Sequence, residues 1–508
     1  MALSREPYVP HRLIVIVCTV GATLMQALDQ TIANVALPYM QGSLSATYEE
    51  ITWVLTSYIT AAAIMTAPVG WMAARFGRKY LFIVCLIGFT VTSMLCGAAR
   101  TLDQMVVFRV LQGIFGAALV PLSQSTMMDM YPAEKRGQAM AIWGIGVMIG
   151  PILGPTLGGY LTELYNWRFV FYINLPFGIL ATLGLAICMP RSHPNFNMRF
   201  DWIGFAVLSL GIGGIQMMLD RGQHQDWFSS PEVIAECVLG LLGFYLFAVH
   251  MATAPKPFIP PAMFKDRNFT AGALVMFAAG TVLVSSSSLM APWLQNLANY
   301  PVETAGLVMG PRGLGTMAAM LTGGRLTAKI DPRKLMAFGI SMLIWSIWEM
   351  TAWTPDVSQW RIVATIVVQG AGLGFLFIPL QVLAFATLPG QYRTDGASLF
   401  SLFRNLGAAI GVSVTSSTLA HNTQVLHAEI GGAITPFNRA LMDGGAVARF
   451  WDPATKQGAA LLDKVINHQA QIIAYIDDYK MMVFTTAPMF LLLLLMRRPA
   501  GQGSTPTR

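Results

Sequence analysis

Two ionisable side chains, Asp29 and Arg109, lie inside long apolar stretches of the sequence. Charged groups are costly within such stretches, and those that occur there usually serve a function. Because burial disfavours the charged form of a carboxyl group, Asp29 is suited to taking up and releasing protons. The alternative is a structural carboxylate that hydrogen bonds hold in place.

The depths of these two residues predict an ion pair. On helices that rise 1.5 Å per residue, Asp29 lies about 4 to 5 Å and Arg109 about 10 Å to the same side of the middle of their stretches. An arginine side chain can bridge that difference. Protonation of Asp29 would then release Arg109 and bias the protein between two conformations. The alternative is that Arg109 extends to the nearby surface.

Other polar side chains in apolar stretches are candidates for lining a substrate cavity. Gln26, Asp29 and Gln30 follow helical spacing, so they form one polar stripe that we expect to face such a cavity. The further candidates are Asn34, Gln112, Arg312, Gln369 and Arg404. Arg404 lies two turns into its stretch, so its side chain can either line the cavity or reach the inner surface.

The composition requires a membrane environment for the elements that carry these residues. Of 508 residues, 55% are hydrophobic and 11% are charged, against about 25% charged in soluble domains. The five cysteines fall within apolar stretches and form no CxxC motif. The sequence contains no GxxxxGK[ST] loop, metal-ligand cluster or catalytic triad. We therefore expect no enzyme, no cofactor and no direct use of ATP.

Fourteen apolar stretches are long enough to span a membrane as helices. They are 13–39, 51–72, 80–99, 105–128, 138–160, 169–189, 202–219, 233–253, 270–292, 304–326, 335–353, 361–385, 396–419 and 480–496. Most of the 32 Lys and Arg residues fall in segments on one side, which predicts that both termini are cytoplasmic. This distribution also argues against nucleic acid as a partner, despite the net charge of +7.

The sequence repeats itself. Gln112-Gly113 and Pro121-Leu122 recur as Gln369-Gly370 and Pro379-Leu380, at offsets of 257 and 258 residues. The repeat predicts a six-helix half in residues 1–200, two inserted helices in 201–265 and a second six-helix half in 266–508. Two such halves with a site between them are the plan of a transporter.

A hydrophilic segment, residues 420–479, separates the last two stretches and is expected to face outward as a long loop. Within it, residues 459–476 show apolar residues at helical spacing. This pattern predicts either a helix lying on the membrane or a docking surface for a partner outside.

A glycine-rich stretch, residues 144–159, predicts a close helix contact. Glycines recur every fourth residue, so one side of the helix lacks side chains and a neighbouring helix can approach its backbone. We expect this ridge to form the seam between the halves, and two prolines to bend the helix. The residues concerned are Gly146, Gly150, Pro151, Gly154, Pro155, Gly158 and Gly159.

With these motifs assembled, the chain resembles the major facilitator superfamily, most closely its fourteen-helix drug:proton antiporter family of EmrB and QacA type. The residues that carry the resemblance are 28–38, 70–79, 109–113, 144–159 and 467–478. The resemblance implies an all-α membrane protein of fourteen helices. It also implies that residues 144–159 are the motif that marks antiporters.

Residues 70–79 resemble the superfamily's gating motif, here carried by Gly70, Arg75, Gly77 and Arg78. The motif usually has an acidic residue where this chain has Ala74. Asp129, at the inner end of the fourth stretch, is our candidate for the missing acid.

The resemblance implies export of small amphipathic drugs across the inner membrane, driven by the proton-motive force. EmrB-like proteins further imply a periplasmic adaptor of EmrA type and an outer-membrane channel of TolC type. One alternative keeps the fold but exports a specific endogenous metabolite, siderophore or lipid. Another is a membrane receptor or structural component without transport.

Overall fold

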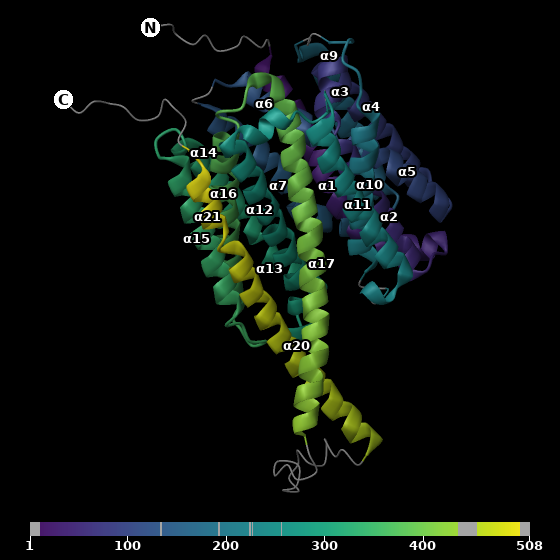
Figure 1. Ribbon diagram of the computed structural model, residues 1–508. Helices are drawn as coiled ribbons and strands as arrows, with labels where there is room; N and C mark the ends of the chain where they lie inside the picture. Colours follow the sequence, from purple (N-terminus) through teal and green to yellow (C-terminus); the bar gives the residue numbers. More distant parts are fainter. Residues whose placement is uncertain are drawn as a thin grey trace, which may run out of the picture.

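The computed structural model describes residues 11–132, 135–190, 194–222, 225, 227–255, 257–434 and 455–497. Over this part the chain folds into a bundle of α-helices with a few short 3-10 and π turns (Figure 1). We call the end of the bundle where the first described helix begins and the last one ends the terminal face, and the opposite end, from which two helices project, the extension face.

The first helices form what we call the N-terminal group. Its members are α1 (Arg12–Leu44), α2 (Tyr48–Thr66), α3 (Val69–Phe76), α4 (Arg78–Ala98), α5 (Leu102–Gly116), α6 (Leu119–Met130), α7 (Arg136–Leu164), α8 (Phe169–Tyr172) and α9 (Asn174–Cys188). Gly77, between α3 and α4, has a φ of 86° that favours glycine, which explains why the helix breaks there.

The helices α10 (Trp202–Arg221) and α11 (Pro231–Thr253) pack mainly on each other, and α10 also contacts α2 and α17. The remaining helices form the C-terminal group. Its members are α12 (Arg267–Pro292), α13 (Val302–Met309), α14 (Pro311–Leu326), α15 (Pro332–Met350), α16 (Gln359–Ala384), α17 (Arg393–Ala433), α20 (Lys456–Thr486) and α21 (Met489–Leu495).

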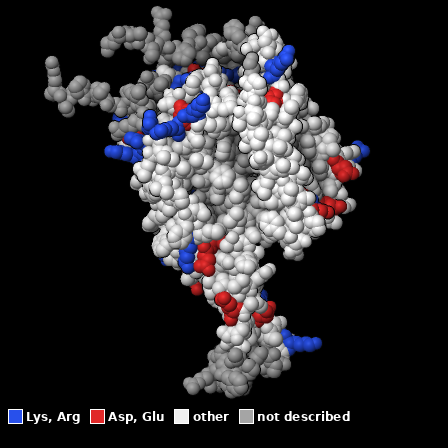
Figure 2. Space-filling model, in the orientation of Figure 1, with Lys and Arg blue, Asp and Glu red and all other residues white. Residues whose placement is uncertain are grey.

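Helices cover all fourteen predicted stretches, but the count of fourteen spans is not confirmed. In the described residues, ten helices are long and apolar enough to cross a membrane, or eleven if α2 and α3, bent by 57°, form one span. The stretch 304–326 is divided between α13 and α14, each shorter than a full span. Around the middle of the bundle, Figure 2 shows a band of uncharged surface with charged side chains mainly above and below it.

The two groups are packed alike. In the N-terminal group α1 packs on α7, and α5 packs between α2 and α4. In the C-terminal group α12 packs on α17, and α16 packs between α14 and α15. The groups meet through contacts of α7 with α14 and α16, and of α17 with α2, α3 and α6.

The buried core differs between the two faces. One large apolar cluster includes residues from both groups, such as Met127 and Phe400. Two smaller clusters each belong to one group: Ile32 and Trp167 lie in the first, and Trp293 and Trp353 in the second. The second of these holds the far ends of α12 and α15, so the groups share their core toward the terminal face and not at the extension face.

The segment 420–479, expected as a long loop, is largely helical where it is described. The helix α17 runs without interruption to Ala433, and α20 begins at Lys456. Beyond the bundle the two helices project together from the extension face (Figure 1). The Nε2 atom of His427 on α17 lies 2.8 Å from the Oδ1 atom of Asp463 on α20. Residues 459–476 are thus part of the helix α20, which continues from the projection into the bundle.

Candidate functional site

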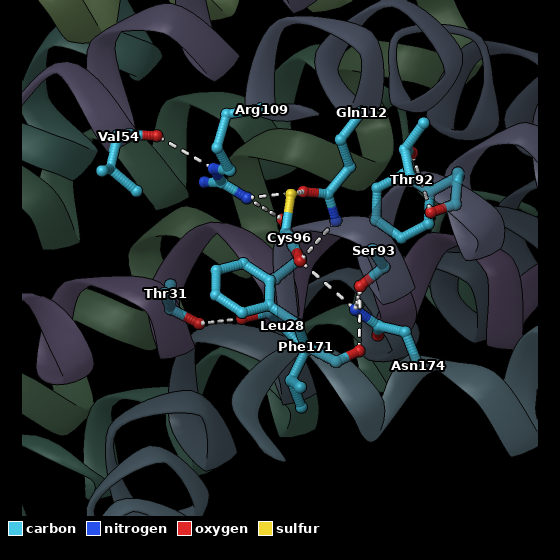
Figure 3. A network of polar contacts seen from close by, with 12 residues as sticks. Leu28, Thr31, Val54, Thr92, Ser93, Cys96, Arg109, Gln112, Phe171 and Asn174 are labelled. Carbon is cyan, nitrogen blue, oxygen red and sulfur yellow. Dashed lines mark hydrogen bonds and ion pairs between the residues drawn. The ribbon is translucent and has the colours of Figure 1, made fainter. Parts of the chain in front are cut away.

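Asp29 and Arg109 form a buried ion pair between α1 and α5. The Arg109 Nη1 donates to Asp29 Oδ2 at 2.8 Å, and both side chains are almost completely buried. The pair predicted from helix depths is therefore present, and Arg109 does not extend to the surface. Figure 3 shows Arg109 beside Gln112 and the Val54 carbonyl.

Two amides complete the surroundings of the carboxylate. Gln112 Nε2 donates to Asp29 Oδ1 at 2.8 Å, and Asn174 Nδ2 of α9 donates to the same oxygen at 3.2 Å. Asn174 is itself positioned by Ser93 of α4, whose hydroxyl accepts at 3.0 Å from the amide and donates to the Phe171 carbonyl. The guanidinium and the two amides thus give the Asp29 carboxylate three side-chain donors.

Arg109 is held just as closely. Its Nε donates to the Val54 carbonyl at 2.9 Å, and its Nη1 also donates to Gln112 Oε1 at 2.9 Å. The guanidinium carbon lies 4.3 Å from the centre of the Tyr58 ring, a cation–π contact. Removing one member of such a buried pair leaves an uncompensated charge, at a cost of about 3–5 kcal/mol. The ion pair and its hydrogen bonds therefore connect α1, α2, α5 and α9.

The rest of the expected polar stripe makes no hydrogen bond to Asp29 or Arg109 in the described structure. Gln26 is buried with its Oε1 unpartnered among the described residues, Gln30 is half-buried, and Asn34 is exposed. Asp29 points into the N-terminal group, toward α5 and α9. These side chains therefore do not line the one common cavity that helical spacing had predicted.

The remaining predicted cavity residues are likewise in different places. Gln112 belongs to the Asp29 network. Arg312 donates to Ser287 and Ser286 of α12, at 2.5 and 3.0 Å. Gln369 is buried within the C-terminal group, and its Oε1 has no partner in the described structure. Arg404 alone of the set lines a narrow pocket between the two groups.

This central pocket contains several polar atoms without partners. Gln124 and Trp143 line it from the N-terminal group, and Gln381 and Ser401 line it with Arg404 from the C-terminal group. In the described structure the Gln124 Nε2, Trp143 Nε1 and Gln381 Oε1 atoms have no hydrogen-bond partner. Such atoms at a contact between the two groups are available to a bound molecule.

At the terminal face, Asp129 connects the two groups. It pairs with Arg78 of the gating motif and, at 2.5 Å, with Arg393 of α17. Close by, a Cβ atom on Gly70 would lie within 2.8 Å of the Asp395 backbone, so only glycine allows α3 and α17 this close. Arg75 instead donates to the main-chain carbonyls of Phe196 and Met198. Asp129, our candidate for the missing acid, is therefore ion-paired with one arginine from each group.

The glycine ridge of α7 packs differently from our expectation. Cβ atoms on Gly146, Gly150 and Gly154 would collide with Val20, Ala27 and Thr31 of α1, in the same group. The contact with the other group comes from earlier glycines of α7, where Gly137 meets Gly324 of α14 and Gly144 meets Met320. The ridge is thus a seam within the N-terminal group. A glycine at every fourth position allows close approach by any neighbouring helix, so the pattern does not specify which helix packs there. Gly158 is buried, whereas a Cβ on Gly159 would meet nothing within 4 Å.

Sequence reasoning missed Asn174, Tyr58 and Ser93, which surround the ion pair, and Arg393, which completes the Asp129 bridge. Polar residues in apolar helices were the available signal for Asn174 and Ser93. For Arg393, the repeat was the signal, since it aligns this residue with Arg136.

The fold and site can now be compared with known proteins. A family model described as Major Facilitator Superfamily matches residues 19–412, so the chain belongs to this superfamily of membrane transporters and is not an enzyme. Two solved structures share the fold. The human organic anion transporter MFSD10 has a TM-score of 0.61 at 13% identity, covering 94% of this chain and 100% of that one. A bacterial homolog of the lysosomal transporter Spinster has a TM-score of 0.56 at 18% identity, covering 96% and 98%.

Relatives with closer sequences confirm the predicted kinship with EmrB-type proteins. The multidrug export protein EmrB of Escherichia coli (strain K12) is 33% identical, over 95% of this chain and 94% of that protein. The protein of the same name in Haemophilus influenzae is 35% identical, over 82% of each chain. The fatty acid resistance protein FarB of Neisseria gonorrhoeae is 33% identical, over 89% of each.

Proposed function

We propose that this protein exports amphipathic or hydrophobic drugs in exchange for protons, using no bound cofactor. The observation that carries the proposal is the buried Asp29–Arg109 pair with its amide donors. Relatives named as multidrug export proteins supply the cargo class. A specific endogenous metabolite, siderophore or lipid is the competing cargo on the same fold.

In this mechanism Asp29 is the proton-carrying group. Protonation removes its charge, so Arg109 loses its counter-ion and must find other acceptors or water. That change favours a second conformation, in which Asp29 releases its proton. The exchange needs only that the two conformations open the site to opposite sides.

The two helix groups are the moving halves, and α10 with α11 is the inserted pair. The Asp129 bridge to Arg78 and Arg393 holds the halves together at the terminal face. The core is also shared there and separate at the extension face. This conformation is therefore the one closed at the terminal face, and breaking the bridge is part of opening it.

We place the protein in the inner membrane, with both termini in the cytoplasm and the extension facing the periplasm. The excess of Lys and Arg in the segments on the terminal side supports this orientation. The projecting ends of α17 and α20 then offer a surface for an adaptor of EmrA type, which would connect to a channel of TolC type.

The test uses the full chain in proteoliposomes with a trapped pH-sensitive dye. An imposed proton gradient should drive uptake or release of ethidium, and adding ethidium should move protons. Chemically unrelated drugs should compete with ethidium. Lack of competition by any of them would favour a single specific cargo, and lack of any flux across a broad panel would contradict transport.

Asp29→Asn should reduce proton-driven ethidium flux by at least about 100-fold, since the asparagine cannot carry a proton. The matched control is Asp103→Asn, which removes an exposed carboxylate from the first turn of α5. Correct assembly of both variants is checked by size-exclusion chromatography. Full flux in Asp29→Asn would remove this residue from the mechanism.

A further inference from the structure

Asp478 of α20 is a buried acid that the mechanism above does not use. Its side chain is 0% exposed, yet neither of its carboxylate oxygens has a hydrogen-bond partner in the described structure. The neighbouring Asp477 is the opposite case, since it is 43% exposed and lies 3.1 Å from Lys480. Two adjacent aspartates thus occupy entirely different surroundings.

The position of Asp478 on its helix explains the burial. Every fourth residue of α20 from Ala470 to Thr486 is buried, and Asp478 is in the middle of this stripe. The residues before and after it on the same face, Tyr475 and Met482, belong to the apolar cluster around Trp293 and Trp353. The carboxyl group is therefore enclosed by apolar packing at the extension end of the C-terminal group.

No cation of the described structure compensates Asp478. On the adjoining helices, His427 pairs with Asp463 and Glu349 pairs with Arg361. Asp463 is fifteen residues from Asp478, about 22 Å along a helix. His421 and Glu429 of α17 are exposed, and Arg404 is in the central pocket. The remaining charged residues of α12, α15 and α17 lie in the first turns of those helices, toward the terminal face: Arg267, Arg333, Lys334, Arg393 and Asp395.

The phenols of Tyr475 and Tyr479 are the titratable groups that lie on the same side of α20. The Tyr479 hydroxyl also has no partner among the described residues. Both are neutral at ordinary pH. A carboxylate in such surroundings would lack a counter-ion and hydrogen bonds, which disfavours the charged form, so the group takes a proton instead.

We propose that Asp478 is a second proton-binding site, protonated in the conformation in which Asp29 is ionised. When α20 moves against α15 and the cluster opens, the O–H bond of the carboxyl group breaks, the proton passes to water and the carboxylate is hydrated. On return the carboxylate takes a proton from water before it is buried again. This inference rests on the proposed function, and it adds one proton to each transport cycle.

The first test measures protons moved per ethidium in proteoliposomes for three proteins: the natural chain, Asp478→Asn and Asp477→Asn. If Asp29 and Asp478 each carry one proton, Asp478→Asn should about halve the ratio. Asp477→Asn should leave the ratio unchanged, although it removes the same charge one residue away. Equal ratios in all three proteins would overturn the inference.

The second test needs no transport. Infrared difference spectra of the detergent-solubilised protein between neutral and alkaline pH should show a protonated carboxyl band. The band should be absent from Asp478→Asn, kept in Asp477→Asn and shifted in frequency in Asp478→Glu. A band that persists in Asp478→Asn would overturn the assignment, even if the variant transports poorly because it packs less well.

The two tests separate the inference from the function on which it rests. If the natural chain moves no protons with ethidium, the proposed exchange fails, whereas the infrared band still decides whether Asp478 holds a proton. If proton-coupled flux is present and the band is absent, only the role of Asp478 fails.

Discussion

Gln112 of α5 and Gln369 of α16 occupy equivalent places in the repeat, 257 residues apart, but their surroundings differ. Gln112 bridges Asp29 and Arg109, using both ends of its amide. Gln369 has a distant contact with the Met350 sulfur at 4.0 Å, and its Oε1 has no partner in the described part of the chain. By the same offset, Ile366 is at the position equivalent to Arg109, and Ser286 is at the position equivalent to Asp29. The C-terminal group thus keeps the glutamine without the ion pair.

The backbone packing of the two groups is nevertheless the same. Gly150 of α7 lies against Ala27 of α1, and Gly407, 257 residues later on α17, lies against Phe277 of α12. The repeat therefore preserves the close helix pair while the chemistry beside it has changed. Our inference places the acid of the C-terminal group elsewhere, on α20.

The largest expected difference in stability between equivalent substitutions is at the ion pair. Arg109→Gln should destabilise the protein by about 3–5 kcal/mol, because Asp29 is left buried without its counter-ion. Ile366→Leu, at the equivalent position in the C-terminal group, should cost less than about 1.5 kcal/mol. Unfolding in detergent measures both. Adding Asp29→Asn to Arg109→Gln should recover part of the loss, and an additive double variant would contradict a direct coupling.

The glycine seams should respond alike in the two groups. Gly150→Ala and Gly407→Ala should each cost about 1–3 kcal/mol, since a Cβ would lie 2.6 Å from the Ala27 Cβ and 2.1 Å from the Phe277 carbonyl oxygen. Gly159→Ala is the control, because a Cβ there meets nothing within 4 Å. Thermal unfolding of the three variants tests this. A large effect in only one of the two seams would show that the groups are not packed equivalently.

The glutamines should respond differently. Gln112→Leu removes a donor from Asp29 and an acceptor from Arg109, so it should cost about 1–3 kcal/mol. Gln369→Leu replaces an amide whose oxygen is unsatisfied, so it should be neutral or stabilising. The same unfolding measurement compares them. Similar losses for both would mean that the Gln369 amide is hydrogen-bonded in the folded protein, which would contradict this prediction.

The smallest expected effect is at the terminal face, where the groups join. Asp129→Asn should weaken two partly exposed ion pairs, worth about 1 kcal/mol together. The change should shift the population toward the conformation open at the terminal face. Fluorescence energy transfer between labels on α3 and α17 measures the shift, with Asp103→Asn as the control. An unchanged distance distribution would argue against a gating role.

Much of the fold followed from patterns along the chain. Apolar stretches located the helices, and the repeat located two similarly packed groups. The pairing of Asp29 with Arg109 followed from helical rise, because depth along a straight helix can be counted. Asp129 was named as a candidate from its place at the end of a span near the basic residues 75–79, and the structure pairs it with Arg78.

Other features depended on direction around each helix and on neighbours distant in sequence, which only the tertiary structure decides. The glycine face of α7 allows close packing of any neighbouring helix, so the sequence could not predict whether its partner is α1 or a helix of the C-terminal group. Likewise, spacing placed Gln26 and Gln30 on the same side of the helix as Asp29, but it did not predict the surroundings of each side chain. Asp477 and Asp478 differ by one residue in sequence, and a rotation of about 100° per residue leaves one in water and the other enclosed.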